Sequence, residues 1–210
     1  AQALCQRHGT LLVMDETHTL STARGGYARA HGLEPDFFVA GKAVAGGLPC
    51  ALYGFTAEVA GRMRAAKDAA PEGHSGIGTT LAGNALTLAA LHAALSHLHT
   101  EASYAHMLGL AERLERGLSQ HIATHSLPWT VTRLGARMEL QFLPHTPANA
   151  QDVVDHAQPE LESYTHLFML NRGVLLTPFH GMMLLSPATQ AADVERLLAV
   201  FAALCAALTN

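Results

Sequence analysis

Two short apolar runs near the start of the chain each lead into a polar residue of distinctive chemistry. Residues 11–14 lead into Asp15, and residues 36–40 lead, after one glycine, into Lys42. Runs of this length, bounded by polar residues and glycine, are typical of strands buried on both faces in a parallel sheet. The carboxyl ends of such strands meet at one edge of the sheet, where ligands bind. We therefore expect Asp15 and Lys42 to lie at the same edge of an α/β fold.

The order of the remaining elements predicts two domains. Strands and helices alternate over residues 1–95, which indicates part of a three-layer α/β/α domain. Residues 96–210 follow a different order, which indicates a smaller α+β domain. The expected elements are an opening helix closed by Gly9 and Thr10, a third strand at 51–55, a helix at 56–67 capped by Thr56, helices at 84–99 and 100–125, a strand pair at 129–133 and 137–142, a helical stretch at 149–171 interrupted by Pro159, short strands at 174–176 and 182–185, and a last helix capped by Thr189.

Composition excludes several classes of protein. Hydrophobic residues make up 49% of the 210 residues and charged residues 14%, which fits a globular chain and not a disordered one. The 13 lysines and arginines are scattered and the net charge is -4, so nucleic acid is not an expected partner. The apolar stretch at 197–208 is too short to span a bilayer and predicts a docked C-terminal helix. The widely spaced Cys5, Cys50 and Cys205 predict free thiols in a reducing cytoplasm.

Lys42 lies among apolar residues and glycines, which is an unusual setting for a lysine. A lysine amine attacks a carbonyl only in its neutral form, and burial favours that form. Gly41, Gly46 and Gly47 would let the backbone approach a flat ring closely. An acid on the preceding strand is what a pyridine-ring cofactor requires at its ring nitrogen. The sequence therefore predicts that Lys42 is a buried Schiff-base amine and that Asp15 is its buried acidic partner. The alternatives are a surface lysine and an acid at a strand end.

Three segments together resemble the class III aminotransferases, which are pyridoxal-phosphate enzymes of fold type I. The segments are residues 15–19 (DETHT), 41–49 (GKAVAGGLP) and 78–86 (GTTLAGNAL). The resemblance is strongest to the branch that contains glutamate-1-semialdehyde aminomutase and the β-amino-acid transaminases. It implies that Lys42 forms the Schiff base with pyridoxal phosphate and moves the proton of the substrate. It implies that Asp15 keeps the ring nitrogen protonated.

The same resemblance implies roles for four neighbouring residues. Thr17 stands where the family usually has a valine against the ring face, and His18 stands where many members have a glutamine near the ring hydroxyl. Thr80 matches the threonine that binds the cofactor phosphate of the neighbouring subunit, with Thr79 as a rival. The working unit would then be a homodimer with shared active sites. The role of Glu16 stays open between holding the loop and serving the site.

The implied reaction moves an amino group from an amino acid or amine, such as a β-amino acid or an ω-amine, to a keto acid or aldehyde. Family chains are about twice as long, so this chain resembles their C-terminal half, and an N-terminal half would supply the rest of the site. Two alternatives stay open. One is a 1,2-aminomutase of the glutamate-1-semialdehyde type, and the other is an inactive fragment that binds no cofactor by itself.

Substrate-contacting residues are weaker predictions. His180 lies in a turn of the kind that approaches the substrate entrance in the family, and Arg137 and Arg172 could each grip a carboxylate with a bidentate fork. The chain has 14 histidines, and His121 and His125 have the spacing of metal ligands on one helix face. No cysteines or paired acids accompany them, so we expect no metal site.

Overall fold

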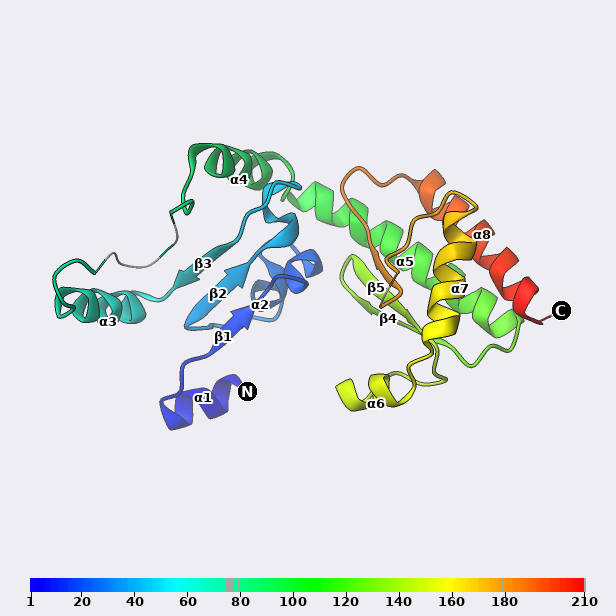
Figure 1. Ribbon diagram of the computed structural model, residues 1–210, viewed down its shortest axis with the longest axis horizontal. Helices are drawn as coiled ribbons and strands as arrows, with labels where there is room; N and C mark the ends of the chain where they lie inside the picture. Colours follow the sequence, from blue (N-terminus) through cyan, green and yellow to red (C-terminus); the bar gives the residue numbers. More distant parts are fainter. Residues whose placement is uncertain (75–77, 79, 179, 210) are drawn as a thin grey trace. The chain divides into compact units, whose positions relative to one another are not determined.

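The computed structural model describes residues 1–74, 78, 80–178 and 180–209. The chain divides into two compact units, Ala1–Glu101 and Ala102–Asn210, whereas the sequence placed the boundary after residue 95. Figure 1 shows the order of the elements in each unit.

The first unit contains a three-stranded sheet in the order β1-β2-β3. Its elements are α1 (Gln2–His8), β1 (Val13–Asp15), η1 (Thr19–Thr22), α2 (Gly26–Ala30), β2 (Phe37–Ala40), η2 (Lys42–Ala45), β3 (Leu52–Phe55), α3 (Ala57–Asp68) and α4 (Ala85–His97). Strands β1 and β2 are parallel, and β3 is antiparallel to β2. The connection between β1 and β2 carries α2 as a crossover helix. The short connection between β2 and β3 carries only a 3-10 turn, so the chain returns in the opposite direction.

Helix ends in this unit follow local capping chemistry. Gly9 ends α1 with a φ of 62°, which a glycine adopts without strain. Thr56 caps α3, as predicted, by accepting the Val59 N–H at 3.4 Å. α4 begins at Ala85, one residue after the predicted start at 84, because Asn84 accepts the Thr87 N–H at 2.9 Å and serves as its cap.

The sheet of the first unit is less buried than the sequence predicted. Val13 in β1 is 56% exposed, and Leu11 is also exposed. The cluster of buried residues in this unit is small: Ala40, Val44 and Ala45, with partly buried neighbours that include Leu20, Phe38, Leu52 and Leu91. β1 is an edge strand that this small core leaves largely uncovered, so the prediction of a strand buried on both faces is wrong for this chain.

The second unit is an α+β arrangement around one larger core. Its elements are α5 (Glu101–Thr124), β4 (Thr130–Leu134), β5 (Arg137–Gln141), α6 (Ala150–Asp155), α7 (Pro159–Leu170), β6 (Met182–Leu184) and α8 (Ala191–Thr209), and α5 starts at the last residue of the first unit. The three strands form an antiparallel sheet in the order β4-β5-β6. Pro159 opens α7, which explains the predicted break in the helical stretch. Residues 174–176 form no strand, so that prediction is wrong.

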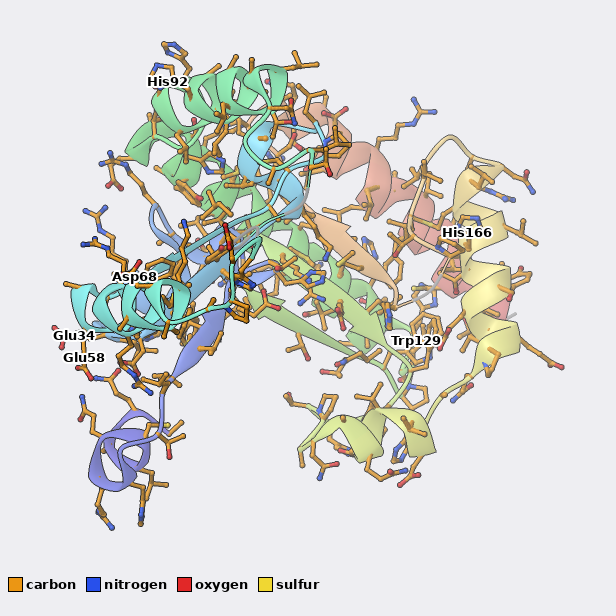
Figure 2. The ribbon with its side chains drawn as sticks, turned by 60° about the vertical axis from the view of Figure 1, so that its left-hand side comes forward. Glu34, Glu58, Asp68, His92, Trp129 and His166 are labelled. Carbon is orange, nitrogen blue, oxygen red and sulfur yellow. The ribbon has the colours of Figure 1, made fainter. Side chains whose placement is uncertain are left out.

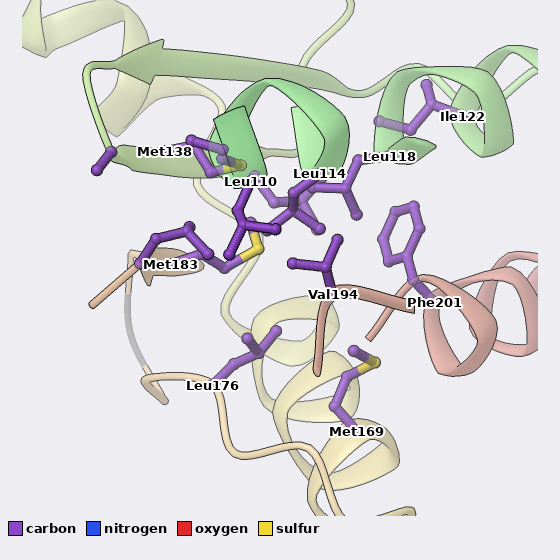
Figure 3. Close-up of a cluster of buried hydrophobic side chains, with 14 of the residues drawn as sticks. Leu110, Leu114, Leu118, Ile122, Met138, Met169, Leu176, Met183, Val194 and Phe201 are labelled. Atoms are coloured by element: carbon purple, nitrogen blue, oxygen red, sulfur yellow. The ribbon is translucent and has the colours of Figure 1, made fainter. Parts of the chain in front are cut away.

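The core of the second unit is built on one face of α5. Leu110, Leu114, Leu118 and Ile122 recur every four residues and meet side chains from the sheet, α7 and α8 (Figure 3). The facing side chains include Met138, Met169, Met183, Val194 and Phe201. Burial of Phe201, Leu204 and Cys205 confirms that the apolar C-terminal stretch is a docked helix.

The start of α8 differs from the prediction. Thr189 does not cap the helix, because its hydroxyl accepts the Ser186 N–H at 3.0 Å. The side chain of Asp193 instead accepts the Gln190 N–H at 2.8 Å, and the helix begins at Ala191.

In the part of the chain that the structure describes, no helix is both long and apolar enough to cross a membrane.

Candidate active site

Asp15 ends β1, and the turn that follows holds its carboxylate. Thr17 donates its backbone N–H to Oδ1 at 2.9 Å and its hydroxyl to the same oxygen. The hydroxyl bond and then the backbone bond lower the pKa of Asp15 below its ordinary value; burial opposes them, and the charges of Lys42 and His18 reinforce them. Asp15 is therefore ionised at neutral pH. Its other oxygen, Oδ2, has no hydrogen-bond partner among the described residues.

Lys42 begins the 3-10 turn η2 just after β2 ends. Its φ is 50°, and the other described non-glycine residues with positive φ are Ser126 and His180. Such a backbone costs about 1–3 kcal/mol and is often found at functional sites. The Lys42 side chain makes no hydrogen bond or ion pair with any described residue.

The ends of β1 and β2 bring Asp15 and Lys42 to the same edge of the sheet. Asp15 is in register with Val39, three residues before Lys42. Gly41 lies so near the turn after β1 that a Cβ on it would be 3.9 Å from the Thr17 methyl carbon. Both side chains are exposed, however, so the prediction that they are buried is wrong for this chain. The reason is the same as for β1: within this unit little covers the edge of the sheet.

Glu16 points away from this edge and is 0% exposed. Its carboxylate accepts the backbone N–H of Tyr27 at 2.9 Å and of Ala28 at 2.6 Å, both from α2, and also the hydroxyl of Thr19. The sequence left Glu16 open between a structural and a functional role. These bonds show that it holds the loop. The signal in the sequence was an acid followed, nine and ten residues later, by the paired glycines at the start of α2.

The remaining cofactor candidates are His18, Thr80 and Thr79. His18 is exposed directly after Thr17, and its charge acts on Asp15. Thr80 is exposed and lies four residues before the Asn84 cap, so it does not itself open α4. Thr79 lies outside the described residues. The phosphate-binding roles of Thr80 and Thr79 stay predictions.

The three substrate candidates belong to the second unit, and two already have partners there. The guanidinium of Arg137 pairs with the carboxylate of Glu139, and its Nε lies 3.1 Å from the Met182 sulfur. Arg172 stacks 3.6 Å above the ring of Phe168 and donates to its carbonyl at 3.2 Å. These contacts explain both arginines structurally, and their substrate roles stay predictions.

His180 is exposed and has a φ of 67°. The next residue, Gly181, accepts the Leu140 N–H at 3.1 Å, and a Cβ on Gly181 would lie 2.7 Å from the Leu140 carbonyl oxygen. The turn that carries His180 is therefore pressed against β5. Its substrate role stays a prediction.

The histidines have varied surroundings. His92 projects from α4 into solvent, whereas His166 on α7 bonds the Leu176 carbonyl at 2.9 Å (Figure 2). His125 meets the Thr209 hydroxyl at 3.0 Å, and His121 lies against the ring of Phe201. Among the described residues, no three histidines, cysteines or acids are grouped so that they could hold a metal ion.

The edge of the first sheet thus offers a primary amine and an ionised carboxylate whose Oδ2 accepts no hydrogen bond from a described residue. The amine can condense with a carbonyl, and the carboxylate can hold a cationic N–H group. Ligands of open α/β sheets bind at the carboxyl ends of the parallel strands, so this edge is a candidate ligand site.

Comparison with known proteins defines the family. The model of the class III aminotransferase family matches residues 1–203, and the chain belongs to this family. Among curated relatives, glutamate-1-semialdehyde 2,1-aminomutase 2 of Brevibacillus brevis is 32% identical over 196 residues, which are 92% of this chain and 44% of that protein. The glutamate-1-semialdehyde 2,1-aminomutase of Thermus thermophilus is 34% identical over 196 residues, which are 91% of this chain and 44% of that protein.

Solved structures agree with this assignment. A glutamate-1-semialdehyde aminomutase from Pseudomonas aeruginosa PAO1, crystallised with PMP, has a TM-score of 0.91 and 45% identity, and the match covers 99% of this chain and 47% of that one. A β-phenylalanine aminotransferase from Variovorax paradoxus has a TM-score of 0.84 and 26% identity, with 97% and 46% covered. The chain therefore has the α/β fold of these proteins and spans less than half the length of each of them.

Proposed function

We propose that this chain carries the lysine and the acidic residue of a pyridoxal-phosphate aminotransferase. The enzyme would move an amino group from an amino acid or amine to a keto acid or aldehyde. The observation that carries the proposal is the meeting of Lys42 and Asp15 at the carboxyl edge of two parallel strands, with the charge of one acting on the other. Membership of the class III family supports it.

The residues at this edge fit the chemistry of pyridoxal phosphate. When bound, this cofactor supplies an aldehyde for amines and a protonated ring that takes up the electron pair of a broken C–H bond. Asp15 is ionised, and its Oδ2 is available to accept the N–H of a pyridinium ring. Lys42 is the only lysine in the first fifty residues, and its amine makes no hydrogen bond or ion pair with a described residue.

Each residue has a distinct task in this proposal. Asp15 would hold a proton on the ring nitrogen, and Thr17 would keep the Asp15 carboxylate ionised and oriented. The Nζ atom of Lys42 would bind the cofactor and, once released, take the proton from the substrate Cα as a general base. His18 and Thr80 would contact the cofactor, with Thr80 reaching the neighbouring subunit of a homodimer.

The chain has only two lysines, Lys42 and Lys67, which makes the assignment directly testable. Lys67 is exposed in the last turn of α3 and is a matched control. We would incubate the chain with pyridoxal phosphate, reduce it with borohydride and map the labelled peptides. The proposal expects the label on Lys42, retained in Lys67→Ala and lost in Lys42→Ala. Equal labelling of both lysines, or no label on Lys42, would contradict it.

An aminomutase is the second candidate, and the names of the relatives favour it. The relatives from Brevibacillus brevis and Thermus thermophilus are both aminomutases, whereas the Variovorax paradoxus neighbour is an aminotransferase. The two reactions differ in their stoichiometry. An aminotransferase consumes one molecule of keto acid or aldehyde for each amine it converts, whereas an aminomutase returns the amine to a neighbouring carbon of the same substrate. Turnover that does not depend on an added acceptor would favour the aminomutase.

Exposed leucines on α4 support the proposed dimer. Leu86 is 69% exposed, and Leu88 and Leu95 are also exposed. Large exposed apolar surfaces are typical of protein–protein interfaces. Equilibrium sedimentation of the protein and of Leu86→Glu tests this part of the proposal. We expect the charged variant to shift the mass toward the monomer, and an unchanged mass would exclude α4 from the interface.

A further inference from the structure

Glu16 is an acid buried without a cation. It is 0% exposed, and no ion pair to it is formed by any described residue. A buried carboxylate is costly unless hydrogen bonds replace the water it has lost. Here the replacement is made by the N–H groups of Tyr27 and Ala28, at 2.9 and 2.6 Å, and by the Thr19 hydroxyl. The side chain is thus tied to the start of α2.

The backbone of Glu16 is tied down as firmly as its side chain. Its N–H donates to the Val39 carbonyl at 2.7 Å, which continues the β1–β2 ladder one residue past Asp15. Its carbonyl accepts the Leu20 N–H at 2.9 Å, which closes the turn that contains Thr17. Every polar group of Glu16 is therefore used, and its two sequence neighbours are Asp15 and Thr17.

The surrounding chain is shaped to admit this carboxylate. Gly26 has a φ of 76°, and a Cβ on it would lie 2.7 Å from Oε2 of Glu16 and 2.8 Å from its Cδ. Any larger residue would press on the carboxylate. The carboxylate consequently occupies a close-fitting socket made of Gly26, the two N–H groups of α2 and the Thr19 hydroxyl.

We propose that Glu16 is a positioning residue for the active site: by fixing the backbone on both sides of itself, it holds the Thr17 donors against Oδ1 of Asp15 and leaves Oδ2 directed to the ligand. This role rests on the proposed function of Asp15. Glu16 itself does not touch the ligand, because its side chain is buried on the side of α2. The chemistry it serves is recognition of a cationic aromatic N–H group by Asp15.

The test replaces Glu16 with glutamine, which keeps the shape but sets an NH2 group against backbone N–H donors. The readout is the titration of the Asp15 carboxyl carbon, followed by NMR in the full chain. If Glu16 positions Thr17, the pKa of Asp15 rises in Glu16→Gln, and exchange of the Thr17 amide hydrogen accelerates about tenfold or more, a factor that corresponds to ~1.4 kcal/mol. Glu58→Gln, which changes an exposed acid in the first turn of α3 (Figure 2), should leave both readouts unchanged.

A second pair of variants tests the inference even if Glu16→Gln does not fold. Thr19→Val removes one of the three donors to the carboxylate, and Thr19→Ser restores the hydroxyl. We expect the Asp15 pKa to rise in Thr19→Val and to return in Thr19→Ser. Folded variants that leave Asp15 and the Thr17 amide unchanged would overturn the inference.

The lysine-labelling experiment keeps this inference separate from the proposed function. If Lys42 is labelled but the pKa of Asp15 does not change in Glu16→Gln, the role of Glu16 is refuted and the proposed function stands. If the pKa of Asp15 rises in Glu16→Gln but Lys42 is not labelled, the proposed function is refuted and the positioning of Asp15 by Glu16 stands.

Discussion

Replacing Gly26 with alanine should destabilise the first unit through the carboxylate of Glu16. Gly26 has a φ of 76°, and the new Cβ would lie 2.7 Å from Oε2 of Glu16. The carboxylate cannot retreat without breaking its bonds to the N–H groups of Tyr27 and Ala28. The left-handed backbone costs about 1–2 kcal/mol, and the forced displacement adds about 1–3 kcal/mol. We therefore expect a loss of about 2–5 kcal/mol in the free energy of unfolding.

Gly32 offers a matched control in the same unit. Its φ is 61°, and a Cβ on it would meet nothing within 4 Å. Gly32→Ala should therefore cost only the backbone contribution of about 1–2 kcal/mol. The difference between the two variants isolates the contact with Glu16.

Urea unfolding of the two variants measures this difference. With a slope of about 2 kcal/mol/M, the additional loss in Gly26→Ala lowers the unfolding midpoint by about 0.5–1.5 M relative to Gly32→Ala. Amide hydrogen exchange at Tyr27 and Ala28 reports on the first unit. The single tryptophan, Trp129, is buried in the second unit and reports on that unit separately. Equal losses in the two variants would refute the account of the Glu16 socket.

Two further predictions concern titration. Thr17→Val should raise the pKa of Asp15, because the Thr17 hydroxyl is the largest cause of its lowering. A lowered carboxyl pKa stabilises the fold above the unfolded-state pKa, and this stabilisation is lost as the pH falls through the native pKa, so the variant should lose less stability in acid than the parent protein. An Asp15 carboxyl titration that NMR finds unchanged would contradict this prediction. Burial raises the pKa of Cys205 from 9.0 to about 11, so a thiol reagent at pH 8 should label the half-buried Cys5 and Cys50 and spare Cys205. The unfolded chain loses the Cys205 proton first, so stability should fall between about pH 9 and 11; labelling of all three thiols at one rate would contradict the prediction.

Local chemistry in the sequence determined much of the fold. The cap at Thr56, the glycine stop at Gly9 and the break at Pro159 each act within one turn of the chain, so a single segment is enough to predict them. The apolar face of α5 likewise follows from side chains spaced four residues apart. The identities of Asp15 and Lys42 as site candidates came from residue type and position after an apolar run.

Long-range contacts decided what the sequence could not. Exposure of Asp15 and Lys42 depends on which segments cover the edge of the sheet, and no local pattern carries that information. Successive side chains of a strand point to opposite faces, so Glu16 and Asp15 are directed to different surroundings. Glu16 is buried because α2 packs on its side and donates two backbone N–H groups to its carboxylate. A sequence specifies which groups are available for chemistry; the environment of each group, and with it the group's charge, is set by residues that are distant along the chain and close in space.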